Sequence, residues 1–200
     1  INVITSPAFR FAEQYRKISN KKKINKQIKI MVALPISITE SIDIMNIIIK
    51  SFKELSDYSI EWQIRPHPSL KIDIVKKKTE EWPKNYIKSK GTFFENINQV
   101  DLLIGNASST SLESLAFGVP VIIIGSLNSI TQNPISKNIP SFMWNICYQP
   151  YELTSAIKRL AINIDLETKQ KIIHEAEKIK YQYFEPVNKK SVQRYLFNQK

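Results

Sequence analysis

The sequence predicts an α/β fold, in which a Rossmann-like parallel sheet has helices on both faces and further helices follow at the C-terminus. The first observation behind this prediction is that short apolar, β-branched runs alternate with segments of helical periodicity. The second is that residues 119–124 are nearly all β-branched, which is typical of a parallel strand buried on both faces. The clearest runs are residues 28–34, 60–65, 101–104 and 119–124.

Residues 1–27 precede the first of these strands. The segment 1–11 begins with a short β-like run and contains a Ser-Pro turn, whereas the strongly basic segment 12–27 predicts a short helix followed by a linker. The chain begins at Ile1 and not at a methionine. We therefore expect a fragment or a processed product, in which residues 1–27 are the tail of a preceding domain.

The main domain is expected over residues 28–165, beginning with a strand that Pro35 ends. Ser37 or Thr39 can cap the helix that follows. The remaining elements of its first half are expected as helix 40–55, strand 60–65, short helix 70–78, weak strand 85–88 and helix 93–100.

Residues 101–124 predict a strand–turn–helix–strand unit around which the domain is organised. Thr110 and Glu113 have the spacing of a capping box, while Gly118 and Pro120 are placed to end the helix. A polar loop of about 20 residues follows without clear structure, which indicates a functional loop. The last elements are expected as strand 146–148 and helices 151–164, 166–183 and 189–197.

Composition and charge restrict the class of protein. The chain has 42% hydrophobic residues, a net charge of +11 and a single cysteine, Cys147, and no apolar run reaches the roughly 20 residues of a membrane span. We therefore expect a cytoplasmic protein, with peripheral contact to an anionic membrane as one use of the basic charge. Anionic small ligands, or lysine-rich faces that are simply solvated, explain the charge as well. No nucleic-acid-binding motif accompanies it, so we expect no specific nucleic-acid partner.

Four consecutive hydroxyl residues, Ser108, Ser109, Thr110 and Ser111, form what we call the hydroxyl turn, just ahead of a predicted helix. A helix N-terminus presents unpaired N–H groups and a partial positive charge, and hydroxyls add donors without adding negative charge. A phosphate or diphosphate would fit there. One hydroxyl is enough to cap a helix, so four of them favour anion binding over capping alone.

A second polar stretch, Arg65-Pro66-His67-Pro68, follows the second strand. Proline restricts both its own φ and the residue before it, so Arg65 and His67 are held extended. A rigid loop that presents an imidazole and a guanidinium suits phosphate recognition, although a loop histidine bonded to backbone is the alternative. Because both polar stretches follow strands of a parallel sheet, we expect them to share one site at the carboxyl edge.

Glu113 has two interpretations of equal weight: it completes the capping box, or it accepts hydrogen bonds from a ribose diol. No metal site is expected, because one cysteine and two distant histidines, His67 and His174, do not form one. Neither a G-x-G-x-x-G nor a Walker motif occurs. We also find no arrangement that predicts a catalytic residue.

Two motifs, IRPHPSL at 64–70 and NASSTSLESLAFGVPVIII at 106–124, resemble the C-terminal, donor-binding half of GT-B glycosyltransferases. The likeness is closest to bacterial surface-polysaccharide enzymes with an HP motif and a Ser/Ser-Thr motif: sialyltransferases, polysialyltransferases and, more distantly, CDP-glycerol and Kdo transferases. By this resemblance, His67 and Pro68 match the first motif and the first three residues of the hydroxyl turn match the second. In those families the two motifs bind the cytidine nucleotide of the donor, so the resemblance implies the same role for these residues.

The spacing of Glu113, Gly118 and Pro120 also resembles other GT-B donor domains and the non-hydrolysing UDP-N-acetylglucosamine 2-epimerases, in which the glutamate holds the ribose. The resemblance covers residues 28–165. It implies that residues 166–200 are helices packing back towards an N-terminal domain, which supplies the acceptor site and general base in the HP-motif families and which this sequence lacks.

The expected function is therefore the donor-binding half of a glycosyltransferase of surface polysaccharide or lipopolysaccharide biosynthesis, inactive alone. Its expected partners are a nucleotide-activated sugar, CMP- or CDP-linked, and a glycan or lipid-linked acceptor, with no further cofactor. The alternatives are half of a UDP-N-acetylglucosamine 2-epimerase-like enzyme and a non-catalytic Rossmann-like binding domain with a basic surface.

Overall fold

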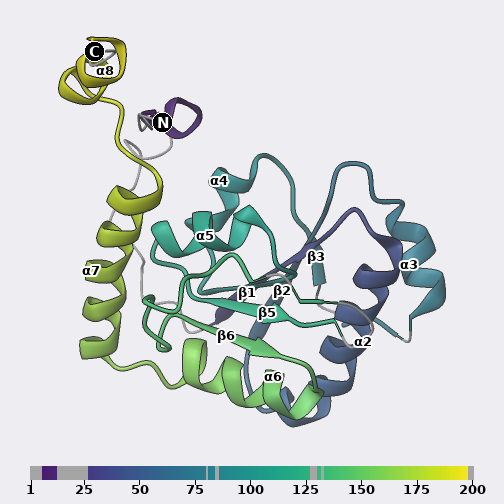
Figure 1. Cartoon of the computed structure of the whole chain (residues 1–200). Coiled ribbons are helices and arrows are strands. Elements are labelled where there is room, and N and C mark those ends of the chain that lie inside the picture. The colour runs from purple at the N-terminus through teal and green to yellow at the C-terminus, as the bar shows by residue number, and fades with distance from the viewer. Residues whose placement is uncertain are drawn as a thin grey trace.

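A computed structural model of the chain describes residues 6–12, 27–79, 81–83, 86–126, 130–131 and 133–197. These residues contain a sheet of six parallel strands in the order β3-β2-β1-β4-β5-β6 (Figure 1). The strands are β1 (Ile28–Leu34), β2 (Ile60–Pro66), β3 (Tyr86–Lys88), β4 (Leu102–Gly105), β5 (Val121–Ile124) and β6 (Trp144–Cys147). The predicted Rossmann-like parallel sheet is confirmed.

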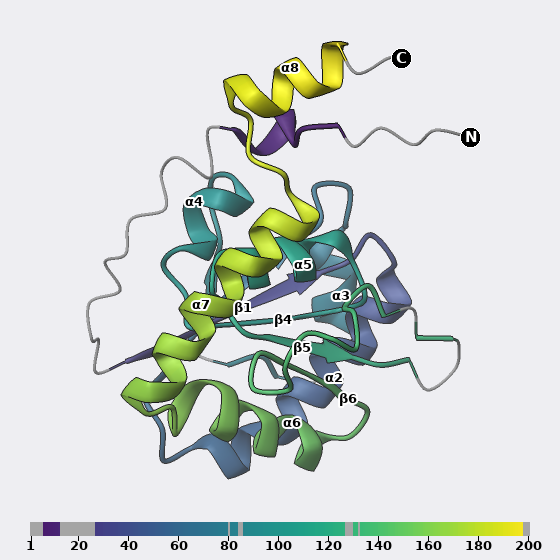
Figure 2. The ribbon, with the colours of Figure 1, turned by 60° about the vertical axis from the view of Figure 1, so that its left-hand side comes forward.

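Helices cover both faces of this sheet (Figures 1 and 2). One face carries α2 (Ile38–Leu55), α3 (Ile72–Lys78) and α6 (Pro150–Ile157), and the other carries α4 (Phe93–Ile97), α5 (Ser109–Ala116) and α7 (Leu166–Tyr183). Alternate strand residues enter the two cores: in β1, Ile30 and Val32 pack on the α2 side and Met31 packs on the α5 side, and all three are fully buried. The consecutive apolar positions of the strands therefore serve two cores.

Most predicted boundaries agree with the structure to within two residues. Ser37 is the N-cap of α2 and accepts a hydrogen bond from the Glu40 N–H at 3.3 Å, as one of the two predicted caps. The helix expected over 93–100 ends at Ile97, because the Gln99 N–H turns back to the Asn96 carbonyl. The helix expected over 151–164 is α-helical only to residue 157, and a π-helical turn, Lys158–Ile162, follows.

The long loop after β5 is more closely packed than the sequence predicts. Its described residues contain neither helix nor strand before β6, but Ile135, Ile139 and Met143 are buried in the core on the α5 side. Residues 127–129 and 132 of this loop lie outside the described residues, as do 1–5 and 13–26, where a β-like run and a short helix are predicted.

The helix α5 ends as the sequence predicts. Gly118 has a φ of +71°, a left-handed conformation that glycine adopts without steric cost. Its N–H donates to the Leu115 carbonyl at 2.9 Å, and the Val119 N–H donates to the Ser114 carbonyl at 3.0 Å. This pair of bonds is a Schellman motif, and it places the start of β5 directly after α5.

Of the two C-terminal helices, α7 packs on the sheet domain and α8 (Lys189–Phe197) lies beyond it. Helix α7 packs along α5 through Ile172, Ala176 and Ile179. Helix α8 lies beside the 3₁₀ turn Phe9–Phe11, at one end of the molecule (Figure 2). The Ala8 N–H donates to the Glu185 carbonyl at 2.9 Å and ties this N-terminal segment to the end of α7. No helix in the described ranges is long and apolar enough to cross a membrane.

Candidate functional site

The candidate site lies where the strand order of the sheet reverses. From β1 the chain adds β2 and β3 on one side and β4, β5 and β6 on the other, so β1 and β4 define a topological switch point. Ligands of open α/β sheets bind outside the carboxyl ends of the strands at such a point. The His67 N–H donates to the Leu34 carbonyl at the end of β1, at 2.9 Å, which continues the β1–β2 ladder by one bond and places the loop after β2 beside the end of β1.

The loop that contains His67 is a restrained turn. The Leu70 N–H donates to the His67 carbonyl at 2.9 Å, and Pro68 occupies the second position of the turn, which proline favours. The Ser69 N–H donates to His67 Nδ1 at 3.2 Å. Neutral imidazole therefore carries its proton on Nε2, and the exposed ring can donate a hydrogen bond from that atom.

Arg65 is grouped with His67 in the sequence, but its side chain bonds to a different segment, the loop between β3 and α4. Its Nη1 donates to the Gly91 carbonyl at 3.0 Å, in the loop between β3 and α4. Burial lowers the pKa of the Arg65 guanidinium, while the nearby Glu95 carboxylate raises it. The guanidinium therefore helps to hold the loop that leads into α4.

The hydroxyl turn forms the start of α5, but not through the predicted capping box. Ser108 is the N-cap in extended conformation, so the helix begins before Thr110 and the expected Thr110–Glu113 box does not form. The hydroxyls of Ser108 and Thr110 share a hydrogen bond of 2.5 Å. Ser111 is buried, and its Oγ lies 3.4 Å from the Asn106 carbonyl oxygen that accepts from it.

This helix start differs from others in the chain. The N-cap side chains of α2, α4 and α7 accept a hydrogen bond from a first-turn N–H, and each of these helices has an acidic residue in its first turn. Helix α5 has no acidic residue there, and the Ser108 side chain accepts from none of its described N–H groups. Within the described part of the chain, the N–H groups of Ser109 and Thr110 have no hydrogen-bond acceptor. The positive end of α5 is therefore open to an anion.

Glu113 lies one turn along α5 from Ser109 and is only 3% exposed. Because Ser108 caps the helix, the capping interpretation of Glu113 is wrong.

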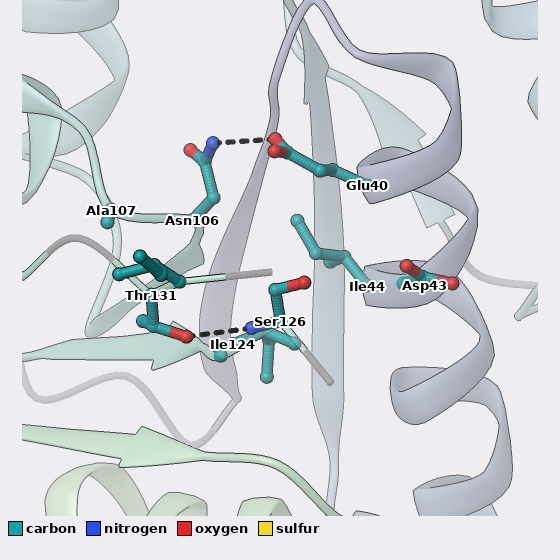
Figure 3. A pocket seen from close by; sticks show the side chains of 10 residues that line it. Glu40, Asp43, Ile44, Asn106, Ala107, Ile124, Ser126 and Thr131 are labelled. Atoms are coloured by element: carbon teal, nitrogen blue, oxygen red, sulfur yellow. Dashed lines mark hydrogen bonds between the residues drawn. The ribbon is translucent and has the colours of Figure 1, made fainter. Parts of the chain in front are cut away.

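A cavity of about 320 Å³ adjoins the hydroxyl turn, between the start of α2 and the ends of β4 and β5 (Figure 3). Its polar lining comprises Glu40, Asp43, Asn106, Ser126 and Thr131. The Asn106 amide donates from Nδ2 to Glu40 Oε2 at 3.2 Å, and the Ser126 N–H donates to Thr131 Oγ1 at 2.9 Å. Two hydrogen bonds therefore hold opposite parts of the lining in place.

The residues predicted for the site do not line this cavity, and reasoning from the sequence missed the ones that do. Glu40 and Asp43 occupy polar positions of a predicted amphipathic helix, and nothing in the sequence distinguishes them from polar residues that face water. Asn106 directly follows a strand and precedes the hydroxyl turn. Its position was therefore the one feature of the sequence that could have indicated a residue of this cavity.

Two other kinds of site receive no support from the described residues. Within them, no group of three or more His, Cys, Asp or Glu side chains could hold a metal ion. Burial raises the pKa of the Cys147 thiol to about 11 and the side chain is fully buried, unlike a reactive nucleophile.

Comparison with known proteins gives matches in structure. No protein-family model and no curated protein sequence matches the chain. Among solved structures, TarM superposes with a TM-score of 0.58 at 16% identity, over 90% of this chain and 36% of TarM. The glycosyltransferase SnogD from Streptomyces nogalater superposes with a TM-score of 0.54 at 18% identity, over 86% of this chain and 44% of SnogD. The wall teichoic acid polymerase TagF superposes with a TM-score of 0.54 at 16% identity, over 90% of this chain and 44% of TagF. TagF has also been solved after a soak with CDPG.

At these identities the likeness shows the fold. The chain spans less than half of the length of each of these three proteins. It therefore has a Rossmann-like domain of the kind found in the half-domains of GT-B glycosyltransferases.

Proposed function

We propose that this chain is the donor-binding half of a glycosyltransferase and that it binds the phosphate of a nucleotide-activated sugar at the start of α5. The observation that carries the proposal is the open N-terminus of α5, beside the switch point of the sheet and on the same edge as the His67 turn. Backbone N–H groups at a helix start, in a turn without acidic side chains, are suited to phosphate.

In this proposal the phosphate accepts hydrogen bonds from the N–H groups of Ser109 and Thr110, and the hydroxyls of the turn add further donors. The bond between the hydroxyls of Ser108 and Thr110 orients both groups before the ligand arrives. His67 donates from Nε2, because Nδ1 already accepts from the Ser69 N–H. Such hydrogen bonds to a charged group are stronger than neutral ones.

The other predicted residues support this contact. Pro68 keeps the turn of His67 in one conformation, and Arg65 holds the loop before α4. Glu113 accepts from the ribose diol, one helical turn from the phosphate. As Glu113 is buried, nucleotide binding would include a small movement of α5 or of this side chain.

The finer parts of the proposal concern the whole enzyme. Among the structural neighbours, TagF was soaked with CDPG and MnaA was solved with UDP, so the choice of a CMP- or CDP-linked donor here rests on the HP and Ser/Ser-Thr motifs and not on the neighbours. A preceding domain would supply the acceptor site and the general base, with α8 and the segment 6–12 packing towards it. We place the enzyme among bacterial HP-motif enzymes of surface polysaccharide biosynthesis, in the cytoplasm at the inner face of the membrane.

Titration of the chain with CMP, CDP, UDP and ADP tests the proposal. We expect weak binding with a preference for the cytidine nucleotides, and we expect His67→Ala to lower the affinity about tenfold or more. His174→Ala removes the other histidine, an exposed residue of α7, and should leave the affinity unchanged.

A folded sample that binds none of these nucleotides at millimolar concentration would overturn the proposal. Preference for UDP over CMP would instead favour the 2-epimerase-like alternative.

A further inference from the structure

The cavity beside the hydroxyl turn has a charge opposite to that of the chain. The chain carries 29 Lys and Arg residues against 18 Asp and Glu residues. Glu40 and Asp43 nevertheless line the cavity, and no Lys or Arg is among the described residues that line it. A random surface of this chain would be basic, so the acidic lining calls for a specific explanation.

The two acidic residues of the lining come from one helix, α2. Glu40 and Asp43 are three residues apart on α2, which makes them neighbours on one side of the helix. The Asn106 amide fixes the Glu40 carboxylate from the opposite loop (Figure 3). A carboxylate has about four acceptor positions, so after this bond it can still accept from hydroxyl or ammonium groups.

Helix stabilisation accounts for only one of these residues. An acidic residue in the first turn interacts favourably with the helix dipole, and Glu40 occupies that turn. Asp43 lies beyond the first turn, where the effect has fallen off. Its place in the cavity lining is therefore not explained by the helix.

The cavity is next to the proposed phosphate site. Asn106 and Ala107 line it, and the hydroxyl turn begins at the following residue. Its volume, about 320 Å³, lies at the lower end of the range for small-molecule sites. A group joined to a phosphate at the start of α5 can therefore enter it.

We propose that this cavity holds the group that the donor nucleotide carries, and that Glu40 and Asp43 select an uncharged or amine-bearing polyol over one with a carboxylate. This inference rests on the proposed function and specifies its substrate class. Hydroxyl groups donate to the two carboxylates, whereas an acidic sugar brings a like charge against them. Donors with a neutral sugar or a glycerol group fit this cavity, and sialic acid or Kdo donors do not.

A matched pair of ligands tests the selection. UDP-glucose and UDP-glucuronate differ only in the hydroxymethyl or carboxylate at C6, and the CDP forms provide the same pair on cytidine. We expect the neutral member to bind at least about tenfold more tightly. The double variant Glu40→Gln, Asp43→Asn should bring the ratio close to one by strengthening binding of the acidic member.

Glu54→Gln is the control variant. It makes the same change of residue type at the far end of α2, where Glu54 is exposed, and it should keep the ratio of the parent chain. Thermal melts confirm that each variant folds, and the single variants Glu40→Gln and Asp43→Asn replace the double variant if it does not. Each single variant should lower the ratio severalfold.

The outcomes separate the two proposals. If bare nucleotides bind but the ratio is near one in the parent chain, or is unchanged in the variants, the charge selection is wrong and the proposed function stands. If neither bare nucleotides nor sugar nucleotides bind, the proposed function is wrong and the selection falls with it.

Discussion

Asn106 donates a hydrogen bond from Nδ2 to Oε2 of Glu40 across 3.2 Å, although the two residues are 66 positions apart in the sequence. The bond joins the loop after β4 to the first turn of α2. Since β1 pairs with β4 through Ala33 and Gly105, this bond lies just beyond the switch point of the sheet. It fixes the wall between the hydroxyl turn and the acidic cavity.

The double variant Ser109→Ala, Thr110→Val should weaken nucleotide binding by about 1–3 kcal/mol, the range for lost hydrogen bonds to a charged group. The affected hydroxyls lie at the open start of α5, and Ser108 stays in place as the N-cap. Isothermal titration with CMP or CDP measures the loss. Ser155→Ala, on the exposed side of α6, is the control. Unchanged affinity together with lower stability would show that the hydroxyls serve the helix and not a ligand.

Glu113→Gln should weaken the binding of cytidine and of CMP by the same factor, because its proposed partner is the ribose and not the phosphate. The hydroxyl-turn variant should weaken only the phosphate-bearing ligand. Parallel titrations of nucleoside and nucleotide on the two variants separate these contributions. An effect of Glu113→Gln on CMP alone would contradict the ribose assignment.

Gly118→Ala should lower the free energy of unfolding by about 1–2 kcal/mol, the cost of a left-handed conformation for a residue with Cβ. Space is not the cause, since a Cβ at this position would lie 3.7 Å from its nearest neighbour, the Cβ of Ala176. Gly118→Asn should cost less, because asparagine tolerates this conformation. Urea unfolding of both variants measures the difference. Equal losses would point to a cause other than φ.

Cys147 should make the stability of the chain fall at alkaline pH. Burial raises its pKa to about 11, whereas an unfolded thiol titrates near 8.5. Below about pH 8.5 both states hold the proton and the contribution is fully present. As pH rises towards 11, unfolding releases a proton, and roughly 2–3 kcal/mol of stability is lost.

The change that checks this prediction is Cys147→Ala, which has no thiol. The variant is expected to be less stable at neutral pH because it leaves a small cavity, but the gap to the parent chain should narrow between about pH 8.5 and 11. Urea unfolding across this range gives both curves. A gap that stays constant with pH would mean that Cys147 does not titrate in the unfolding transition.

Features that depend on neighbouring residues were predictable from the sequence. The consecutive apolar residues of β1 and β5 indicate burial on both faces, and α7 and α8 were placed at their observed bounds from periodicity and the break at Pro186. Gly118 marks the end of α5 because few other residues adopt its conformation. These are local rules of backbone geometry and hydrophobic period, and a sequence displays them directly.

Features that depend on packing between distant segments needed the tertiary structure. Four hydroxyls in a row all satisfy the local rule for an N-cap, so only the path of the chain from β4 into α5 selects Ser108 and excludes the Thr110–Glu113 box. Strand order brings the start of α2 to the end of β4, and this makes Glu40 and Asn106 neighbours. Polar residues on a helix look alike in sequence, whether they face water or a cavity. The acidic cavity was therefore decided by tertiary contacts, whereas the sheet and the position of the hydroxyl turn after β4 were already determined by the sequence.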